Sequence, residues 1–158
     1  MNDQQIKNSI KVWWEKAFRE SDKSSKFLFL WMCFNAWLKY ESGEKTDRAM
    51  LKWLKQQNRQ SSELVDCFES CKTKNTFVDS LKFLAMNSPY KNSRGIGQDI
   101  IVKNENDFEN IVEAIYIVRC NLSHGGSDLN DYMTQKQITF AQNILNDWIA
   151  TLNGRING

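Results

Sequence analysis

Arg119 and His124 carry the side chains of this sequence best suited to acid–base chemistry at a phosphate group. An imidazole takes up and releases a proton near neutral pH, and a guanidinium donates forked hydrogen bonds to phosphate oxygens. Such groups are needed when a ribose 2′-hydroxyl attacks the adjacent phosphate: a base removes the hydroxyl proton, an acid protonates the departing 5′-oxygen and a cation holds the developing charge. His124 is the only histidine of the chain, so a mechanism with two histidines requires two copies of it.

The segment IVEAIYIVRCNLSHGG, residues 111–126, has the pattern of one helix that ends at Gly125 and Gly126. Two stripes run along it about 100° apart: a core stripe of Ile111, Ile115, Val118 and Leu122, and a second stripe of Val112, Tyr116, Arg119 and Ser123. The second stripe sets Arg119 beside Tyr116 at the edge of the core, which favours a groove or a subunit contact, and we favour a subunit contact for Tyr116. His124 lies in the last turn, where its imidazole can reach past the helix end.

The sequence RCNLSHGG, residues 119–126, resembles the R-x4-H signature of HEPN domains, and FNAWL at 34–38 is similar to the early buried helices of that family. The likeness covers residues 10 to 152 approximately. It implies an all-α, antiparallel helical bundle that forms a symmetric dimer, in which two motifs meet in a cleft and cut RNA without a metal or cofactor. In this family such domains often act as toxins or antiphage effectors, which implies a cognate antitoxin or sensor protein as a further partner.

Carried over residue by residue, the resemblance assigns Arg119 and His124 to the active site. In many of these domains a polar residue directly follows the arginine, whereas here Cys120 occupies that position and the amide comes one residue later. The supporting catalytic role therefore falls to Asn121 or to Ser123. Because of this departure, a catalytically inactive HEPN module that binds RNA, nucleotide or a protein partner remains an alternative. A second alternative is a helical interaction protein or antitoxin-like subunit.

Composition predicts one compact helical domain over residues 1–158. The chain is 41% hydrophobic and has six Trp, nine Phe and a single Pro, which is too apolar for disorder and too poor in helix breakers for a loop-rich fold. Periodicity indicates about five to seven helices. The formal net charge is only +2, so affinity for RNA must come from where Lys and Arg lie.

Several helix boundaries follow from capping residues. The first twenty residues predict an amphipathic helix, Ser24 or Ser25 caps the next one, and Gly43 ends it. Further helices are expected from near Thr46, from the cluster 61–63 through Cys71, from Asn75 or Thr76, from a capping box of Asn106 with Glu109, and along Ile138, Ala141, Leu145, Trp148 and Leu152. Asn35 lies inside the apolar segment FLFLWMCFNAWL, so it must find a hydrogen-bond partner, either to brace the motif helix or to satisfy a backbone group.

Two groups of basic residues are candidates for binding RNA phosphates. One follows a helix at spacings of +3, +4, +3 and +4, and comprises Lys45, Arg48, Lys52, Lys55 and Arg59. The other belongs to the loop NSPYKNSRGIGQ and its continuation, and comprises Lys91, Arg94 and Lys103, with Tyr90 as a ring on which a base could stack. For both groups the alternative is a merely solvated surface.

The four cysteines, Cys33, Cys67, Cys71 and Cys120, are interpreted as free thiols. The first residues, MNDQQIKNSIK, lack the apolar stretch of a signal peptide, which favours a reducing cytoplasmic compartment. Cys67 with Cys71, and Cys120 with His124, could converge as zinc ligands from two helices, but the spacing differs from common zinc motifs and a core of this size needs no metal. The longest apolar run, 27–38, is roughly half the length of a membrane span, so we expect no metal site and no membrane partner.

Overall fold

The computed structural model describes residues 2–56 and 62–157, and this part of the chain forms seven helices and no β-strand. The helices are α1 (Asp3–Arg19), α2 (Lys23–Ser42), α3 (Asp47–Gln56), α4 (Glu63–Cys71), α5 (Asn75–Met86), α6 (Phe108–Ser123) and α7 (Tyr132–Asn157). Tyr90 and Ile100 form an isolated antiparallel bridge within the loop between α5 and α6. The prediction of an all-α fold with about five to seven helices is confirmed.

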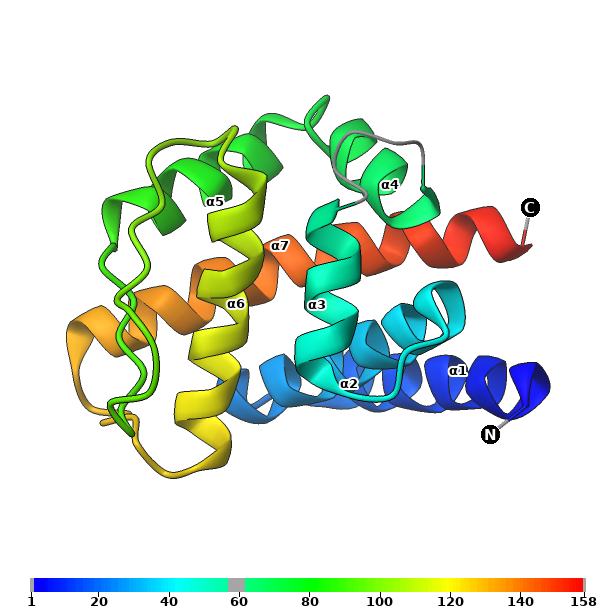
Figure 1. Ribbon diagram of the computed structural model, residues 1–158, viewed down its shortest axis with the longest axis horizontal. Coiled ribbons are helices and arrows are strands. Elements are labelled where there is room, and N and C mark those ends of the chain that lie inside the picture. The colour runs from blue at the N-terminus through cyan, green and yellow to red at the C-terminus, as the bar shows by residue number, and fades with distance from the viewer. Residues whose placement is uncertain (1, 57–61, 158) are drawn as a thin grey trace.

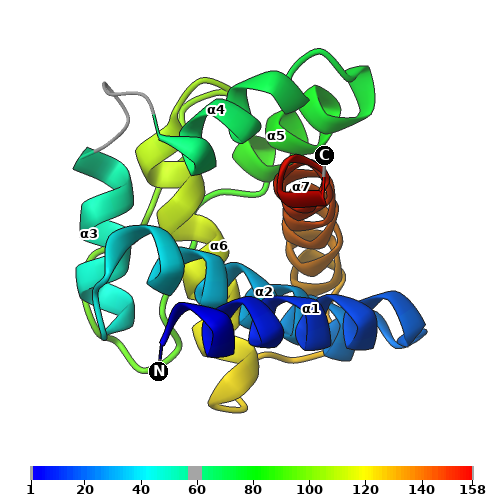
Figure 2. The ribbon, with the colours of Figure 1, turned by 90° about the vertical axis from the view of Figure 1, so that its right-hand side faces the viewer.

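The helices form two layers that place α6 next to α3 (Figure 1). α1 and α2 form an adjacent pair, and α7 packs against α2, α4 and α5. α3 and α6 lie side by side in front of α2 and α7, and the turned view keeps them on the same side of the molecule (Figure 2). The loop between α5 and α6 runs back along α6 (Figure 1), so α6 has α3 on one side and this loop on the other.

The core is built around aromatic side chains from α2, α4 and α7. Trp31, Trp37 and Trp148 are almost completely buried. The Trp148 ring lies 4.6 Å from that of Phe34 and 4.9 Å from that of Phe68, measured between ring centroids. Two of these indole N–H groups make hydrogen bonds within the bundle: Trp148 donates to the Leu64 carbonyl at 2.8 Å, and Trp37 donates to the Asn153 amide oxygen at 3.0 Å. The α7 stripe predicted from periodicity is confirmed, because all five of its members are buried: Ile138, Ala141, Leu145, Trp148 and Leu152.

Most predicted helix ends are confirmed. Gly43 ends α2 in the left-handed region, with a φ of 71°. The hydroxyl of Thr46 accepts a hydrogen bond from the Ala49 amide at the start of α3, and Ser62 caps α4. Residues 57–61, which include Ser61 and Arg59, lie outside the described part of the chain.

Two capping predictions were wrong. The N-cap of α2 is Asp22, whose carboxylate accepts from the Ser25 amide at 2.9 Å, so Ser24 and Ser25 lie inside the first turn. The N-cap of α6 is Asp107, and the expected capping box of Asn106 with Glu109 is not formed. Asp107 instead accepts from the backbone amide of Lys103 at 2.9 Å, which closes the end of the preceding loop. In both cases the N-cap is the aspartate that directly precedes the first helical residue.

All four cysteines are free and buried, as predicted. The Cys71 thiol contacts Thr151 Oγ1 at 3.3 Å on α7, whereas Cys120 and His124 lie at the C-terminal end of α6. Within the described residues, no three His, Cys, Asp or Glu side chains gather as ligands of one metal ion. Across residues 2–56 and 62–157, none of the helices combines the length and apolar character that a bilayer crossing needs.

Candidate active site

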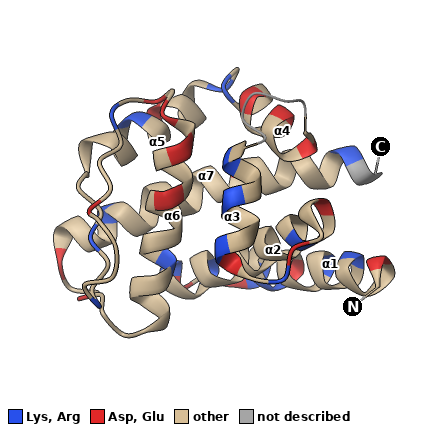
Figure 3. Cartoon of the chain, viewed as in Figure 1, with Lys and Arg blue, Asp and Glu red and all other residues tan. Residues whose placement is uncertain are grey.

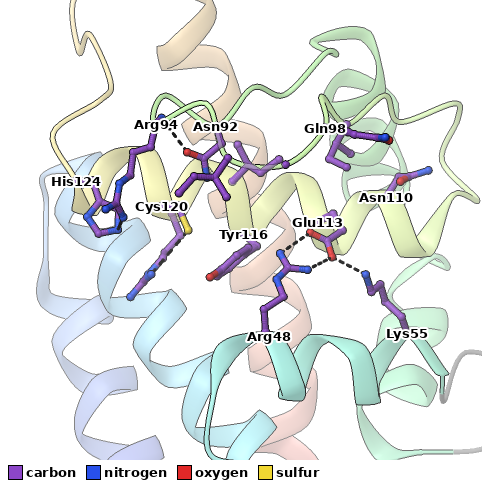
Figure 4. Close-up of a pocket in the computed structure, with 15 residues that line it drawn as sticks. Arg48, Lys55, Asn92, Arg94, Gln98, Asn110, Glu113, Tyr116, Cys120 and His124 are labelled. Carbon is purple, nitrogen blue, oxygen red and sulfur yellow. Dashed lines mark hydrogen bonds and ion pairs between the residues drawn. The ribbon is translucent and has the colours of Figure 1, made fainter.

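Arg119 and His124 line the same cavity, which has a volume of about 620 Å³ and follows one side of α6 (Figure 4). α3 contributes Arg48 and Lys55 to its wall, and the loop 87–107 contributes Arg94. Five Arg, Lys or His side chains therefore line this cavity, and they come from α3, from the loop and from α6. A strand of nucleic acid is the kind of ligand that such a cationic cavity attracts.

His124 lies at the C-terminal end of α6, where it lines the cavity. It is the C-cap residue of the helix, and its backbone amide donates to the Cys120 carbonyl at 3.0 Å. Gly125 follows with a φ of 67°, a conformation that residues with a Cβ adopt only under strain, so the predicted glycine stop is confirmed. The imidazole is exposed, and its Nε2 atom lies 3.4 Å from Nη1 of Arg94. Because a guanidinium only donates, this contact suits an imidazole that carries its proton on Nδ1.

Arg119 is half-buried between α6 and α3. Its Nη1 atom lies 3.6 Å from Oδ2 of Asp47, the first residue of α3. The other oxygen of Asp47 accepts a hydrogen bond of 2.7 Å from the amide of Asn35, which is buried on α2. The partner that the sequence required for Asn35 is therefore a side chain, and the amide braces the motif helix through Asp47.

Asn121 ties the loop 87–107 to the end of α6. Its amide nitrogen donates to the Lys91 carbonyl at 2.9 Å, and its amide oxygen accepts from the Ser93 amide at 2.9 Å. Gly126 permits the same close approach, because a Cβ at that position would lie 1.9 Å from the Ser93 hydroxyl oxygen. These contacts bring Arg94 to His124, so Asn121 serves the site through the loop.

Ser123 is exposed and is not among the residues that line the cavity. Tyr90, which we expected to stack on a base, is buried, and its hydroxyl donates to the Leu84 carbonyl at 2.5 Å. The stacking prediction was therefore wrong. Backbone hydrogen bonds of 2.8 Å and 2.9 Å between Tyr90 and Ile100 close the loop on itself, so Tyr90 anchors the base of the segment that carries Arg94.

The expected basic stripe on α3 divides into two sides. Arg48 and Lys55, seven residues apart, face α6 and line the cavity, whereas Lys45 and Lys52 are exposed and do not line it. Figure 3 shows basic residues of α3 opposite acidic residues of α6. Of the loop cations, Arg94 lines the cavity; Lys91 pairs with Asp99 at 3.7 Å on the surface, and Lys103 is exposed outside the cavity.

Glu113 is a buried carboxylate that the sequence analysis overlooked. Arg48 donates to its two oxygens at 2.8 Å and 3.1 Å, and Lys55 donates to one of them at 2.5 Å (Figure 4). Burial alone would raise the pKa of the Glu113 carboxyl, but the hydrogen bonds and charges of Arg48 and Lys55 outweigh burial and hold this pKa below its ordinary value. Two features of the sequence could have indicated an ion pair here: an acidic residue within the apolar run IVEAI, and the adjacent acidic and basic residues Asp47 and Arg48.

Tyr116 lies between the core and the cavity. Its ring centroid is 5.8 Å from that of Trp31, and the Arg48 guanidinium lies over the ring at 5.0 Å from its centroid. Burial, together with a hydrogen bond to Cys120, raises the pKa of Tyr116 to about 12, so the phenol stays protonated at neutral pH. Within one chain Tyr116 thus supports the position of Arg48, and its role in a subunit contact stays a prediction.

We expect Glu113→Gln to destabilise the fold by about 2 kcal/mol at neutral pH, because Arg48 and Lys55 lose the charge they surround. The pKa of Glu113 is lowered in the folded state, so the charge stabilises the fold above the ordinary value of 4.5 and this stabilisation is lost as the pH falls through the lowered value. The difference from wild type should therefore shrink below pH 4.5 in urea unfolding curves. Glu109→Gln, an exposed position on the same helix, is the control; an equal loss in both variants would contradict the assignment.

We expect Asn121→Ala to release the loop that carries Arg94. Trypsin should then cut after Lys91 or Arg94 several-fold faster than in wild type, since both hydrogen bonds between Asn121 and this stretch are gone. Asn110→Ala is a matched control, because that amide lies on the same helix but bonds to Asp107. An unchanged rate of cleavage after Lys91 and Arg94 would show that the loop holds its position without Asn121.

Comparison of the chain with protein-family models, with curated proteins and with solved structures gives no match. The site combines an exposed imidazole with two guanidinium groups: that of Arg94 contacts the imidazole, and that of Arg119 lines the same cavity. A second basic cluster surrounds a buried carboxylate.

Proposed function

We propose that this protein is a metal-independent endoribonuclease of the HEPN type that acts as a homodimer. The observation that carries the proposal is that the only histidine of the chain, His124, is exposed and lines a cavity that Arg94 and Arg119 also line. An imidazole beside guanidinium groups supplies both proton transfer and stabilisation of charge on phosphate oxygens. The R-x4-H resemblance of residues 119–124 supports the same function.

In the proposed reaction, a histidine takes the proton of a ribose 2′-hydroxyl as that oxygen bonds to the adjacent phosphorus. The bond from phosphorus to the 5′-oxygen breaks, and a protonated group gives that oxygen its proton. The products are a 2′,3′-cyclic phosphate end and a 5′-hydroxyl end. Arg119 and Arg94 hold the phosphate oxygens, since forked guanidinium donors match the charge that develops there.

One His124 cannot act as acid and base at the same time, so a dimer supplies the second imidazole. In a twofold arrangement with the C-terminal ends of two α6 helices facing each other, each copy contributes one imidazole and one Arg119 to a shared cleft. We propose Tyr116 as part of the contact. The family resemblance further suggests a cytoplasmic toxin or antiphage effector, with an antitoxin or sensor protein as partner.

The direct test is the chemistry of the ends. The protein is incubated with a structured RNA in excess EDTA, and the fragments are weighed by mass spectrometry. The proposal predicts paired 2′,3′-cyclic phosphate and 5′-hydroxyl ends. Fragments with 5′-phosphate ends would contradict a 2′-hydroxyl attack.

A catalytically inactive binding module is the second candidate, and the ion pairs of the cavity favour it. Glu113 already engages Arg48 and Lys55, and Asp47 already faces Arg119, whereas Arg94 contacts the imidazole of His124. This candidate predicts binding of the RNA strand with no cleavage under any buffer condition.

A further inference from the structure

Asn35 is a polar side chain in the middle of the apolar, buried stretch of α2. α2 buries nine residues, and Asn35 is one of them, with 9% of its surface exposed. An amide in such a place is costly unless it is hydrogen-bonded, and a leucine would fill the same space without that cost. The bond it makes joins its Nδ2 atom to Oδ1 of Asp47 at 2.7 Å, so what Asn35 fixes is the orientation of one carboxylate.

The carboxylate of Asp47 is not occupied with capping its own helix. Thr46 accepts the Ala49 amide and so does that work at the start of α3. Asp47 has one oxygen on Asn35 and the other 3.6 Å from Nη1 of Arg119. About a quarter of each of the Asp47 and Arg119 side chains is exposed, so the pair lies at the border between the core and the cavity.

We propose that Asp47, oriented by Asn35, is the positioning residue for Arg119 in RNA cleavage; this inference rests on the proposed function. Asp47 touches neither the phosphate nor the imidazole. It fixes one edge of the guanidinium, so that the remaining donors of Arg119 point into the cavity. Three helices thereby act in series: α2 holds the carboxylate of α3, which holds the guanidinium of α6.

Anchoring of α3 does not require this chain of contacts. Met50, Leu51 and Leu54 are completely buried, and Arg48 and Lys55 tie α3 to Glu113 on α6. A negative charge at the border of a cationic cavity also repels an RNA strand before reaction, so Asp47 opposes ground-state binding. Because α3 has these other anchors and the charge of Asp47 opposes binding, the contribution of Asp47 lies in the orientation of Arg119 in the transition state.

The test measures kcat, KM and strand binding for Asp47→Asn. We expect kcat on ribose RNA to fall about 10- to 100-fold, because a misplaced guanidinium loses its alignment with the phosphate. Binding of the uncleavable 2′-deoxy strand, measured by fluorescence anisotropy, should stay equal or tighten. Asn35→Leu should lower kcat in the same direction. Glu63→Gln, which removes the carboxylate 3.3 Å from Arg155 outside the cavity, is the matched control and should leave both quantities unchanged.

A double mutant separates positioning from a general effect on the fold. If Asp47 acts through Arg119, adding Asp47→Asn to Arg119→Ala should cost little further kcat. A full additional loss in the double mutant, or an unchanged kcat in Asp47→Asn, would overturn the inference while leaving the proposed function intact. A wild-type protein that binds the ribose strand and never cleaves it would overturn the proposed function, and the positioning role with it.

Discussion

His124→Ala should lower the rate of RNA cleavage by a factor of about 100 to 10,000, the largest effect expected of any single substitution in this chain. The imidazole is the one side chain here whose ordinary pKa suits proton transfer near neutral pH, and neither arginine can replace it as a base. The residue is exposed and follows the end of α6, so thermal unfolding should stay close to wild type. Single-turnover rates on a defined RNA strand measure the effect.

Added imidazole provides the control for His124→Ala, since a free base in the vacated space should restore part of the rate without changing the fold. Cleavage at the wild-type rate by the purified variant would point to a contaminating nuclease. In that case the binding module would be the better account of the site.

Arg119→Lys should lower the rate of cleavage by a factor of about 100, and Arg119→Ala by about 100 to 1,000. Lysine keeps the positive charge but loses the planar fork that donates two parallel hydrogen bonds to phosphate oxygens. It also loses the geometry with which Asp47 holds the guanidinium. The measurement is the single-turnover rate, with Arg155→Lys as a matched change to an arginine on α7 outside the cavity. Equal rates for Arg119→Lys and wild type would show that charge alone is sufficient.

The fold was largely predictable because the helices carry their own local signals. Hydrophobic periodicity gave the interior face of α7, and Gly43 and Gly125 ended their helices as expected. That Arg119 and His124 line one cavity was predictable for the same reason, since they lie within two turns of each other at the end of α6. Cap residues were harder, because Asp22 and the two nearby serines compete for one position and only the final chain path selects among them.

The supporting residues were not predictable because their partners are distant in sequence. Glu113 is held by Arg48 and Lys55, which are 65 and 58 residues away along the chain. Which side of the α3 stripe faces α6 depends on how the two helices pack, and periodicity does not supply that rotation. Tyr90 shows the same limit, because a ring in a polar loop becomes buried only when the loop folds back on itself.

The central claim, that His124 serves a 2′-hydroxyl mechanism, is tested most directly with two matched strands and two proteins. Wild type and His124→Ala are each incubated, in excess EDTA, with a ribose strand and with the same sequence in 2′-deoxy form, and the products are separated on a gel. The account predicts cleavage of the ribose strand alone, by wild type alone. Cleavage of the 2′-deoxy strand, or equal cleavage of the ribose strand by both proteins, would contradict it.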